Sequence, residues 1–205
     1  MRWFVVLMLY ACSPTVPVDV SPKGSVDVTP QTAERGRDWR RMDLDQLKAS
    51  MERVSGGIPW SSPNGRDSID MFDDLASTLG KPDYRESTIE QLDPSLLFQK
   101  FLKDAANAVC AEIIAEDGRR KPADRQFVTE LDWHATLDTD PDGVRQNLSR
   151  LLLRFHGRTV PASAAEIEEW SWLFRSVLTV TEGEPSRAWN AICVALITHP
   201  DFYTY

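Results

Sequence analysis

Histidine and cysteine are scarce in this chain. Its 205 residues include three histidines and three cysteines, which leaves little room for a zinc or iron site built from several such ligands. Basic residues are outnumbered as well, since 23 Lys and Arg stand against 31 Asp and Glu and the net charge is -8. Because nucleic-acid binders usually present a basic face, this composition argues against a nucleic-acid partner.

Long hydrophobic runs and catalytic motifs are also missing. No stretch of eighteen apolar residues occurs, so no membrane-spanning helix is expected. The sequence has no Gly-x-Ser-x-Gly turn and no glycine-rich phosphate loop after a strand. With 42% apolar residues, the chain still suffices for the core of one domain of about 150 to 170 residues. These features indicate a folded domain with a tail, and they predict that it is not an enzyme.

The first residues have the pattern of a short secretory signal. Arg2 precedes an apolar run from Trp3 to Ala11, and the small residue Ala11 precedes Cys12. The segment Leu9-Tyr10-Ala11-Cys12 resembles the lipobox of bacterial lipoproteins. This resemblance implies that residues 1–11 are a signal peptide that is removed and that the thiol of Cys12 carries a diacylglycerol. Two or three acyl chains suffice for stable membrane anchoring.

The residue after the lipidated cysteine and the following segment suggest an address and a spacer. In lipoproteins of this kind, a serine such as Ser13, in place of aspartate, implies the outer membrane, with the protein facing the periplasm or the cell surface. Residues 12–36 contain four prolines among Ser, Thr, Val and Gly. The alternating valines would suit a pair of strands, but each proline removes a ladder donor. A flexible extended linker is therefore favoured, reaching at most about 70 Å at about 3.1 Å per residue.

Residues 37–205 have a helical pattern throughout, which predicts an all-α domain, an irregular bundle of about seven helices. The first helix has apolar residues from Leu44 to Val54, with Asp43 and Gln46 as a capping pair and Gly56-Gly57 at its end. A second helix is expected over Ile69 to Leu79. No segment is a convincing strand.

The other five expected helices follow from caps and apolar stripes. They are a third opened by Asp93-Pro94 and closed by Asp117-Gly118, a shorter one over Pro122 to Trp133, a fifth from Val144 to Phe155 ended by His156-Gly157, a sixth after the capping box Ser163 to Glu166, and a last one capped by Ser186.

Two cysteines remain if Cys12 is lipidated. Cys110 and Cys193 both lie on apolar faces of expected helices, and the envelope is an oxidising compartment. We therefore predict a disulfide between them, with two separate buried thiols as the alternative.

Short stretches of the chain resemble a known helical domain. They are Arg40 to Leu47 through Gly56-Gly57, Gly157-Arg158-Thr159, Ala164 to Ile167, Trp189, and Ala195 to Phe202. They are similar to a domain of large cytochrome-associated periplasmic proteins of planctomycetes and myxobacteria, and they cover about a third of the chain. The resemblance implies an electron-transfer envelope as the setting, with a cytochrome-containing complex among the partners it suggests. No Cys-x-x-Cys-His occurs, so no attached haem is expected.

An acidic segment is the one candidate cofactor site. Asp138, Asp140 and Asp142 followed by Gly143 fit the first half of a calcium loop. The twelfth position, where a bidentate glutamate is expected, is Ser149. The alternative is an acidic turn in which Asp140 or Asp142 caps the next helix.

Tryptophans and histidines give the remaining candidates. Trp170 and Trp189 fall on apolar helix faces and are expected in the core, whereas Trp172 lies off that face and is the candidate for a partner contact. His156 and His199, near helix C-termini, are expected to complement the helix dipoles.

These features together predict an outer-membrane-anchored lipoprotein whose tethered helical domain binds another envelope protein, without catalysis of its own. The alternative is an envelope enzyme or a calcium-dependent binding protein that uses the acidic loop 138–143.

Overall fold

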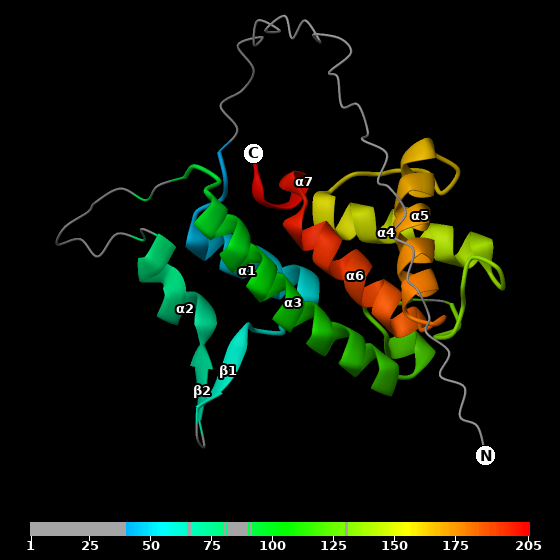
Figure 1. Ribbon diagram of the computed structural model, residues 1–205, viewed down its shortest axis with the longest axis horizontal. Coiled ribbons are helices and arrows are strands. Elements are labelled where there is room, and N and C mark those ends of the chain that lie inside the picture. Colours follow the sequence, from blue (N-terminus) through cyan, green and yellow to red (C-terminus); the bar gives the residue numbers. More distant parts are fainter. Residues whose placement is uncertain (1–39, 65–66, 80, 82–89, 91, 130) are drawn as a thin grey trace, which may run out of the picture. The chain divides into compact units, whose positions relative to one another are not determined.

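The computed structural model describes residues 40–64, 67–79, 81, 90, 92–129 and 131–205 (Figure 1). The expected signal peptide, Cys12 and the linker over residues 12–36 lie outside this part. The described residues are mostly helical, which confirms the predicted all-α class. None of their helices is both long and apolar enough to cross a membrane.

The first helix begins and ends where the sequence predicts. Helix α1 spans Leu44–Ser55. Its capping box is complete, because the Asp43 carboxylate accepts from the Gln46 amide at 2.7 Å and the Asp43 amide donates to the Gln46 side chain at 3.3 Å. Gly56 ends the helix with φ of +77°, in the left-handed region that favours glycine.

A small hairpin replaces part of the second expected helix. Strands β1 (Ser61–Asn64) and β2 (Asp67–Asp70) pair antiparallel, followed by helix α2 (Met71–Leu75) and a 3-10 turn η1 (Ala76–Leu79). The expectation of an unbroken helix here, and of no strand, is therefore wrong. The overlooked signal is Gly65. Asn64 pairs with Asp67, so two residues connect the strands, and glycine at the first of these two positions favours a tight hairpin.

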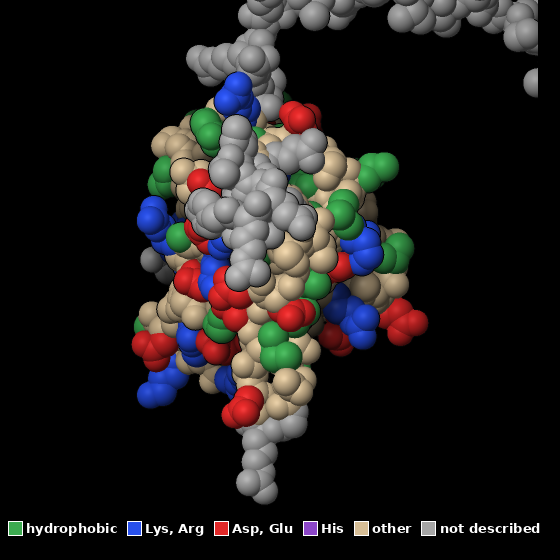
Figure 2. All heavy atoms as spheres, turned by 90° about the vertical axis from the view of Figure 1, so that its left-hand side faces the viewer, with side chains coloured by type: hydrophobic (Ala, Val, Ile, Leu, Met, Phe, Trp, Pro, Cys, Tyr) green, Lys and Arg blue, Asp and Glu red, His purple; other side chains and the backbone are tan. Residues whose placement is uncertain are grey.

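The hairpin is fixed to the domain by aromatic contacts and by the cap of α2. Phe72 contacts the rings of Trp60 and Phe101 edge to face, with centroids 5.5 Å and 5.2 Å away. The carboxylate of Asp70, the last residue of β2, accepts from the amides of Phe72 and Asp73. On this side of the domain acidic and basic side chains are interspersed, without a large patch of one sign (Figure 2).

The long helix α3 spans Leu96–Arg119. Its cap is Ser95, whose hydroxyl accepts from the Phe98 amide at 3.1 Å, so the expected start with Pro94 in the first turn is wrong. A serine hydroxyl at the cap position satisfies one of the first-turn backbone amides that have no partner within the helix. The expected apolar stripe is confirmed, with buried Phe98, Phe101, Leu102, Ala105, Val109 and Ile113.

The helix expected over Pro122 to Trp133 is wrong. In the described residues of this span, 122–129 and 131–133, the one helical element is a 3-10 turn, η2 (Pro122–Asp124). The cause is the buried Asp117, whose carboxylate accepts from the backbone amides of Gln126, Phe127 and Val128 at 2.9, 2.7 and 2.9 Å. These amides point to a side chain, so they are not available to carbonyls four residues back.

Helix α4 (Pro141–His156) agrees with the prediction. The Asp140 carboxylate caps it by accepting from the Gly143 amide at 2.9 Å, and Gly157 ends it with φ of +65°. Its buried Asn147 secures the preceding loop, because the side-chain oxygen accepts from the Thr129 amide.

Two predicted caps are wrong in the last third of the chain. Helix α5 spans Ala165–Val180, and its N-cap Ala164 offers no side-chain bond, so the Ser163 capping box does not form. Helix α6 spans Pro185–Thr198 and follows Glu184, so Ser186 lies inside the helix. Pro185 at the first helical position sets this start, because proline suits a site whose amide is unpaired anyway. A short helix α7 (Pro200–Tyr203) ends the fold.

Helices α3 and α6 pack side by side, and α6 also contacts α5 (Figure 1). The predicted disulfide between Cys110 of α3 and Cys193 of α6 is confirmed, with their Cα atoms 5.7 Å apart. Trp189 lies one helical turn before Cys193 and is fully buried. Its ring centroid is 4.6 Å from that of Phe174. The core position expected for Trp189 is thus confirmed.

The two ends of the described domain are joined by backbone hydrogen bonds. The Met42 amide donates to the Tyr203 carbonyl at 2.7 Å, and the Tyr205 amide donates to the Arg40 carbonyl at 3.1 Å. The buried Arg41 between them forms an ion pair with Glu90 at 2.8 Å.

Loss of the disulfide should destabilise the domain strongly. The bond joins residues 83 positions apart, and a loop of that length gives about 4 to 5 kcal/mol on the chain-entropy model. We expect Cys110→Ala/Cys193→Ala to lower Tm by about 10 °C or more in circular dichroism. Cys12→Ala is the matched control and should leave Tm unchanged. Identical melting of the native chain with and without reductant would contradict the bond.

Removal of the Asp117 charge should loosen the segment that it holds. Asparagine keeps the shape but faces backbone donors with its own amide donor, so Asp117→Asn should reduce the free energy of unfolding by about 3 kcal/mol. Asp124→Asn, on the exposed turn of the same segment, is the control. Urea unfolding measures both, and equal stability of the two variants would refute the role of Asp117.

Candidate functional site

A groove of about 630 Å³ lies between α5 and α6. Its lining side chains are aromatic, apolar and acidic, and they are Glu166, Glu169, Trp170, Trp172, Leu173, Ala195 and His199. The aromatic rings offer apolar contact area, and the two carboxylates supply negative charge.

The face of α5 explains how the tryptophans reach the groove. Ile167, Ser171 and Phe174 are the buried positions of this helix. Trp170 is half-buried against the core, so its expected core position is only partly correct. Trp172 points away from the buried face and is 69% exposed, which makes it accessible to another molecule.

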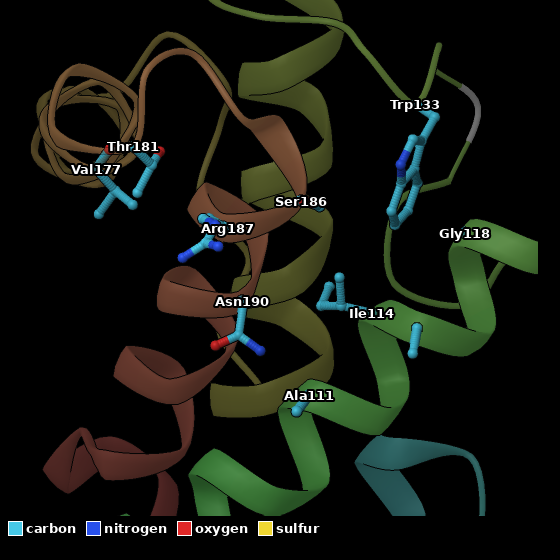
Figure 3. A pocket seen from close by; sticks show the side chains of 10 residues that line it. Ala111, Ile114, Gly118, Trp133, Val177, Thr181, Ser186, Arg187 and Asn190 are labelled. Atoms are coloured by element: carbon cyan, nitrogen blue, oxygen red, sulfur yellow. Dashed lines mark hydrogen bonds between the residues drawn. The ribbon is translucent and has the colours of Figure 1, made fainter.

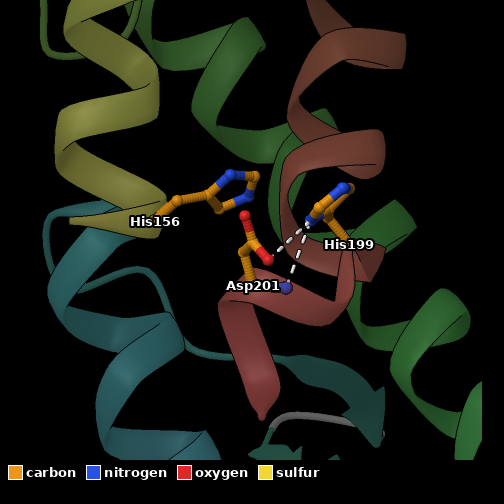
Figure 4. Close-up of side chains that lie close together, drawn as sticks. All are labelled: His156, His199 and Asp201. Carbon is orange, nitrogen blue, oxygen red and sulfur yellow. Dashed lines mark hydrogen bonds and ion pairs between the residues drawn. The ribbon is translucent and has the colours of Figure 1, made fainter. Parts of the chain in front are cut away.

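Two histidines meet at the end of the groove (Figure 4). His156 is the last residue of α4, and His199 follows α6. Their ring centroids are 4.9 Å apart, and each lies about 6 Å from the Trp170 ring, at 6.1 and 6.2 Å. Ligand atoms of both histidines and of Asp201 all lie within 4.8 Å of one another.

The tautomer of His156 follows from one hydrogen bond. Its Nε2 lies 2.9 Å from the carbonyl oxygen of Leu196, and since a carbonyl only accepts, Nε2 carries the hydrogen. Nδ1 then carries a lone pair when the ring is neutral. This atom is buried, and no described residue forms a hydrogen bond with it.

The charge of the His156 ring is set mainly by burial. Burial lowers the pKa of His156 below its usual value, and the neighbouring His199 and Arg158 act in the same direction. The Leu196 carbonyl and Asp201 act in the opposite direction without reversing the shift. His156 is therefore neutral at pH 7, so the expected contribution of a charged His156 to the α4 dipole is not realised.

His199 serves the start of the next helix. Its Nδ1 accepts from the Asp201 amide at 3.1 Å, which makes His199 the N-cap of α7. His199 is also the residue that directly follows α6, at the helix end where the sequence places it, and the cap of α7 is a role that the sequence did not predict. Asp201 Oδ1 lies 3.8 Å from the same nitrogen, and Figure 4 shows both contacts.

Arg158 connects the acidic side of the groove with Asp201. Its guanidinium binds both Glu166 oxygens, at 2.9 and 2.8 Å, and Asp201 Oδ2 at 2.9 Å. The hydrogen bond to Asp201 and the charge of Glu166 raise the pKa of Arg158. Oδ2 of Asp201 is thus engaged, while Oδ1 faces the histidines.

The acidic loop is organised as a helix cap. Asp140 uses a carboxylate oxygen to bind the Gly143 amide, Asp138 is exposed, and Asp142 lies 4.0 Å from Arg145. Over the described ranges, the group of ligand side chains close enough to share an ion is His156, His199 and Asp201, and the loop carboxylates do not form one. The cap alternative therefore accounts for Asp140.

A second hollow of about 620 Å³ lies between α3 and α6 (Figure 3). Ile114 and Gly118 of α3 and Trp133 line one side, and Arg187 and Asn190 of α6 line the other. It contains no cluster of titratable groups among the described residues, so it offers less chemistry than the groove.

Comparison of the chain with family models, curated proteins and solved structures gives no match.

The histidine cluster was missed because its members are 43 and 2 positions apart in sequence. In the sequence, both histidines lie at the ends of expected helices, but this position does not determine the distance between them. The spacing of Asp138, Asp140 and Asp142, by contrast, matches the first half of a calcium loop, but Asp140 is engaged as the cap of α4.

Proposed function

We propose that this chain is an outer-membrane lipoprotein whose helical domain is tethered through Cys12 and residues 13–36 and binds another envelope protein, without catalysis of its own. The observation that carries the binding role is the position of Trp172, which is 69% exposed and lines the groove of α5 and α6. Large aromatic side chains at such sites are typical anchors of protein interfaces.

The charge of the groove favours a particular kind of partner segment. Glu166 and Glu169 lie beside the two tryptophans, and no described residue forms an ion pair with Glu169. Glu166 is already paired with Arg158. A segment that inserts an apolar side chain beside the tryptophans and places Lys or Arg next to Glu169 would complement the site.

The Cys110–Cys193 disulfide supports an envelope location, because such bonds persist in oxidising compartments and are rare in the cytosol. After removal of Arg2 with the signal, 22 Lys and Arg oppose 31 Asp and Glu, so the mature chain has a net charge of -9. Such a domain is repelled by anionic headgroups, which would keep its groove available to a protein partner.

Anchoring is tested at the lipobox. We expect Cys12→Ala to abolish acylation, so that intact-mass analysis finds no diacyl or triacyl adduct and the protein leaves the membrane fraction. Ser13→Asp is the matched control, since it should keep the lipid but retain the protein in the inner membrane. Normal outer-membrane retention of Cys12→Ala would refute the anchor.

Partner binding is tested by cross-linking in cells that carry the full-length lipoprotein. A photoreactive residue at Trp172 should give one adduct with an envelope protein, whereas the same residue at the exposed Lys103 should not. Because the proposed segment is basic, Glu169→Lys should reduce that adduct several-fold while Tm stays unchanged. Equal adducts from positions 172 and 103, or insensitivity to Glu169→Lys, would overturn the binding site.

A further inference from the structure

We propose that His156, His199 and Asp201 bind a divalent transition-metal ion of the zinc class at the end of the groove. The set offers two imidazole nitrogens and one carboxylate oxygen, all within 4.8 Å of one another. Imidazole ligands suit zinc, copper and nickel, whereas calcium and magnesium prefer oxygen alone. This inference goes beyond the proposed binding of an envelope protein and does not depend on it.

The spacing of the two rings fits a shared ion. Two imidazoles bound at 2.0 to 2.1 Å to one tetrahedral ion have their ring centroids about 5.2 Å apart. The centroids of His156 and His199 are 4.9 Å apart. The two rings are stacked, with 28° between their planes, so their in-plane lone pairs do not yet converge on one point. The ligand atoms of such a site are about 3.4 Å apart, so a rotation of the rings together with a contraction of the side chains by about an ångström completes it.

The hydrogen bonds of His156 match those of a metal ligand. Metal-binding histidines usually donate their other ring N–H to a carbonyl or carboxylate, which fixes the tautomer. His156 does this through Nε2 and the Leu196 carbonyl. Its Nδ1 lone pair is left buried with no described partner, and a bound cation would satisfy it.

Asp201 is also held in position by its neighbours. Arg158 holds Oδ2 at 2.9 Å and is itself held by Glu166, so the carboxylate is oriented with Oδ1 toward His199. Ligating carboxylates are commonly fixed in this way. The positive charge of Arg158 opposes a cation, but Glu166 offsets that charge and leaves the charge of Asp201 for the ion.

His199 reaches the ion at the expense of a helix cap. Its Nδ1 accepts from the Asp201 amide, and if Nδ1 binds the ion, this bond is exchanged for the metal bond. Three protein ligands leave a fourth position to water or to a group from the groove, because His199 also lines the groove.

The test uses the untagged full chain in detergent, stripped with a chelator and titrated with Zn²⁺ in a calorimeter, with Co²⁺ as an optical probe. We expect one ion per chain and an absorption spectrum of a nitrogen- and oxygen-ligated tetrahedral cobalt site. Calcium in hundredfold excess should not compete. Absence of saturable Zn²⁺ binding would overturn the proposal.

Matched variants assign the ligands. His156→Gln and His199→Asn should each weaken Zn²⁺ binding by more than about tenfold, and asparagine keeps the cap of α7. His134→Gln, at an exposed histidine elsewhere, should bind like the native chain.

Folding and binding are separated by the His199→Asn variant. If His156→Gln fails to fold, native Tm of metal-free His199→Asn together with lost Zn²⁺ binding still supports the site. Native affinity in folded His199→Asn, or equal loss in His134→Gln, would refute it. None of these readouts changes if Cys12 proves unacylated or Trp172 has no partner, so the two proposals fail separately.

Discussion

The packing of α3 against α6 is the interaction on which the other features of the domain depend. The disulfide between Cys110 and Cys193 joins the two helices at buried positions, and both helices also carry fully buried alanines, Ala105 and Ala106 in α3 and Ala188 in α6. The far end of α3 carries Asp117, and α6 leads into His199 and α7.

At one end of α3, a buried carboxylate forms the hydrogen bonds that secondary structure would otherwise provide. Phe127 and Val128 are fully buried without regular structure, and buried backbone donors require partners. The Asp117 carboxylate accepts from both amides, and the Asn147 side chain donates to the Phe127 carbonyl, so an irregular segment closes the core. Arg154, partly desolvated itself, also lies near this carboxylate, and the charge of Asp117 raises its pKa against the larger lowering effect of burial.

The sequence predicted the parts of the fold that local rules determine. Helices α1 and α4 were placed correctly because an aspartate cap and a terminal glycine lie within one turn of each apolar stripe. The segment 122–133 has helical composition, but Asp117 redirects its amides through contacts that no periodicity encodes. Of the groove residues, the sequence predicted the accessible Trp172 correctly. It could not predict the His156–His199 pair, because that pair depends on where α4 and α6 end in space.

The two proposed occupants of the groove would interact electrostatically. A metal ion at His156, His199 and Asp201 adds two positive charges close to Glu166, on the side of the groove where a basic segment is proposed to bind. Like charges in a partly desolvated groove repel, so the ion would weaken the docking of Lys or Arg. A partner side chain that fills the open coordination position would have the opposite effect, because its metal bond offsets that repulsion. By linkage, the partner changes the affinity for the ion in the same direction and by the same factor as the ion changes the affinity for the partner. The chemistry of the segment beside the tryptophans therefore determines whether metal and partner bind together or in alternation.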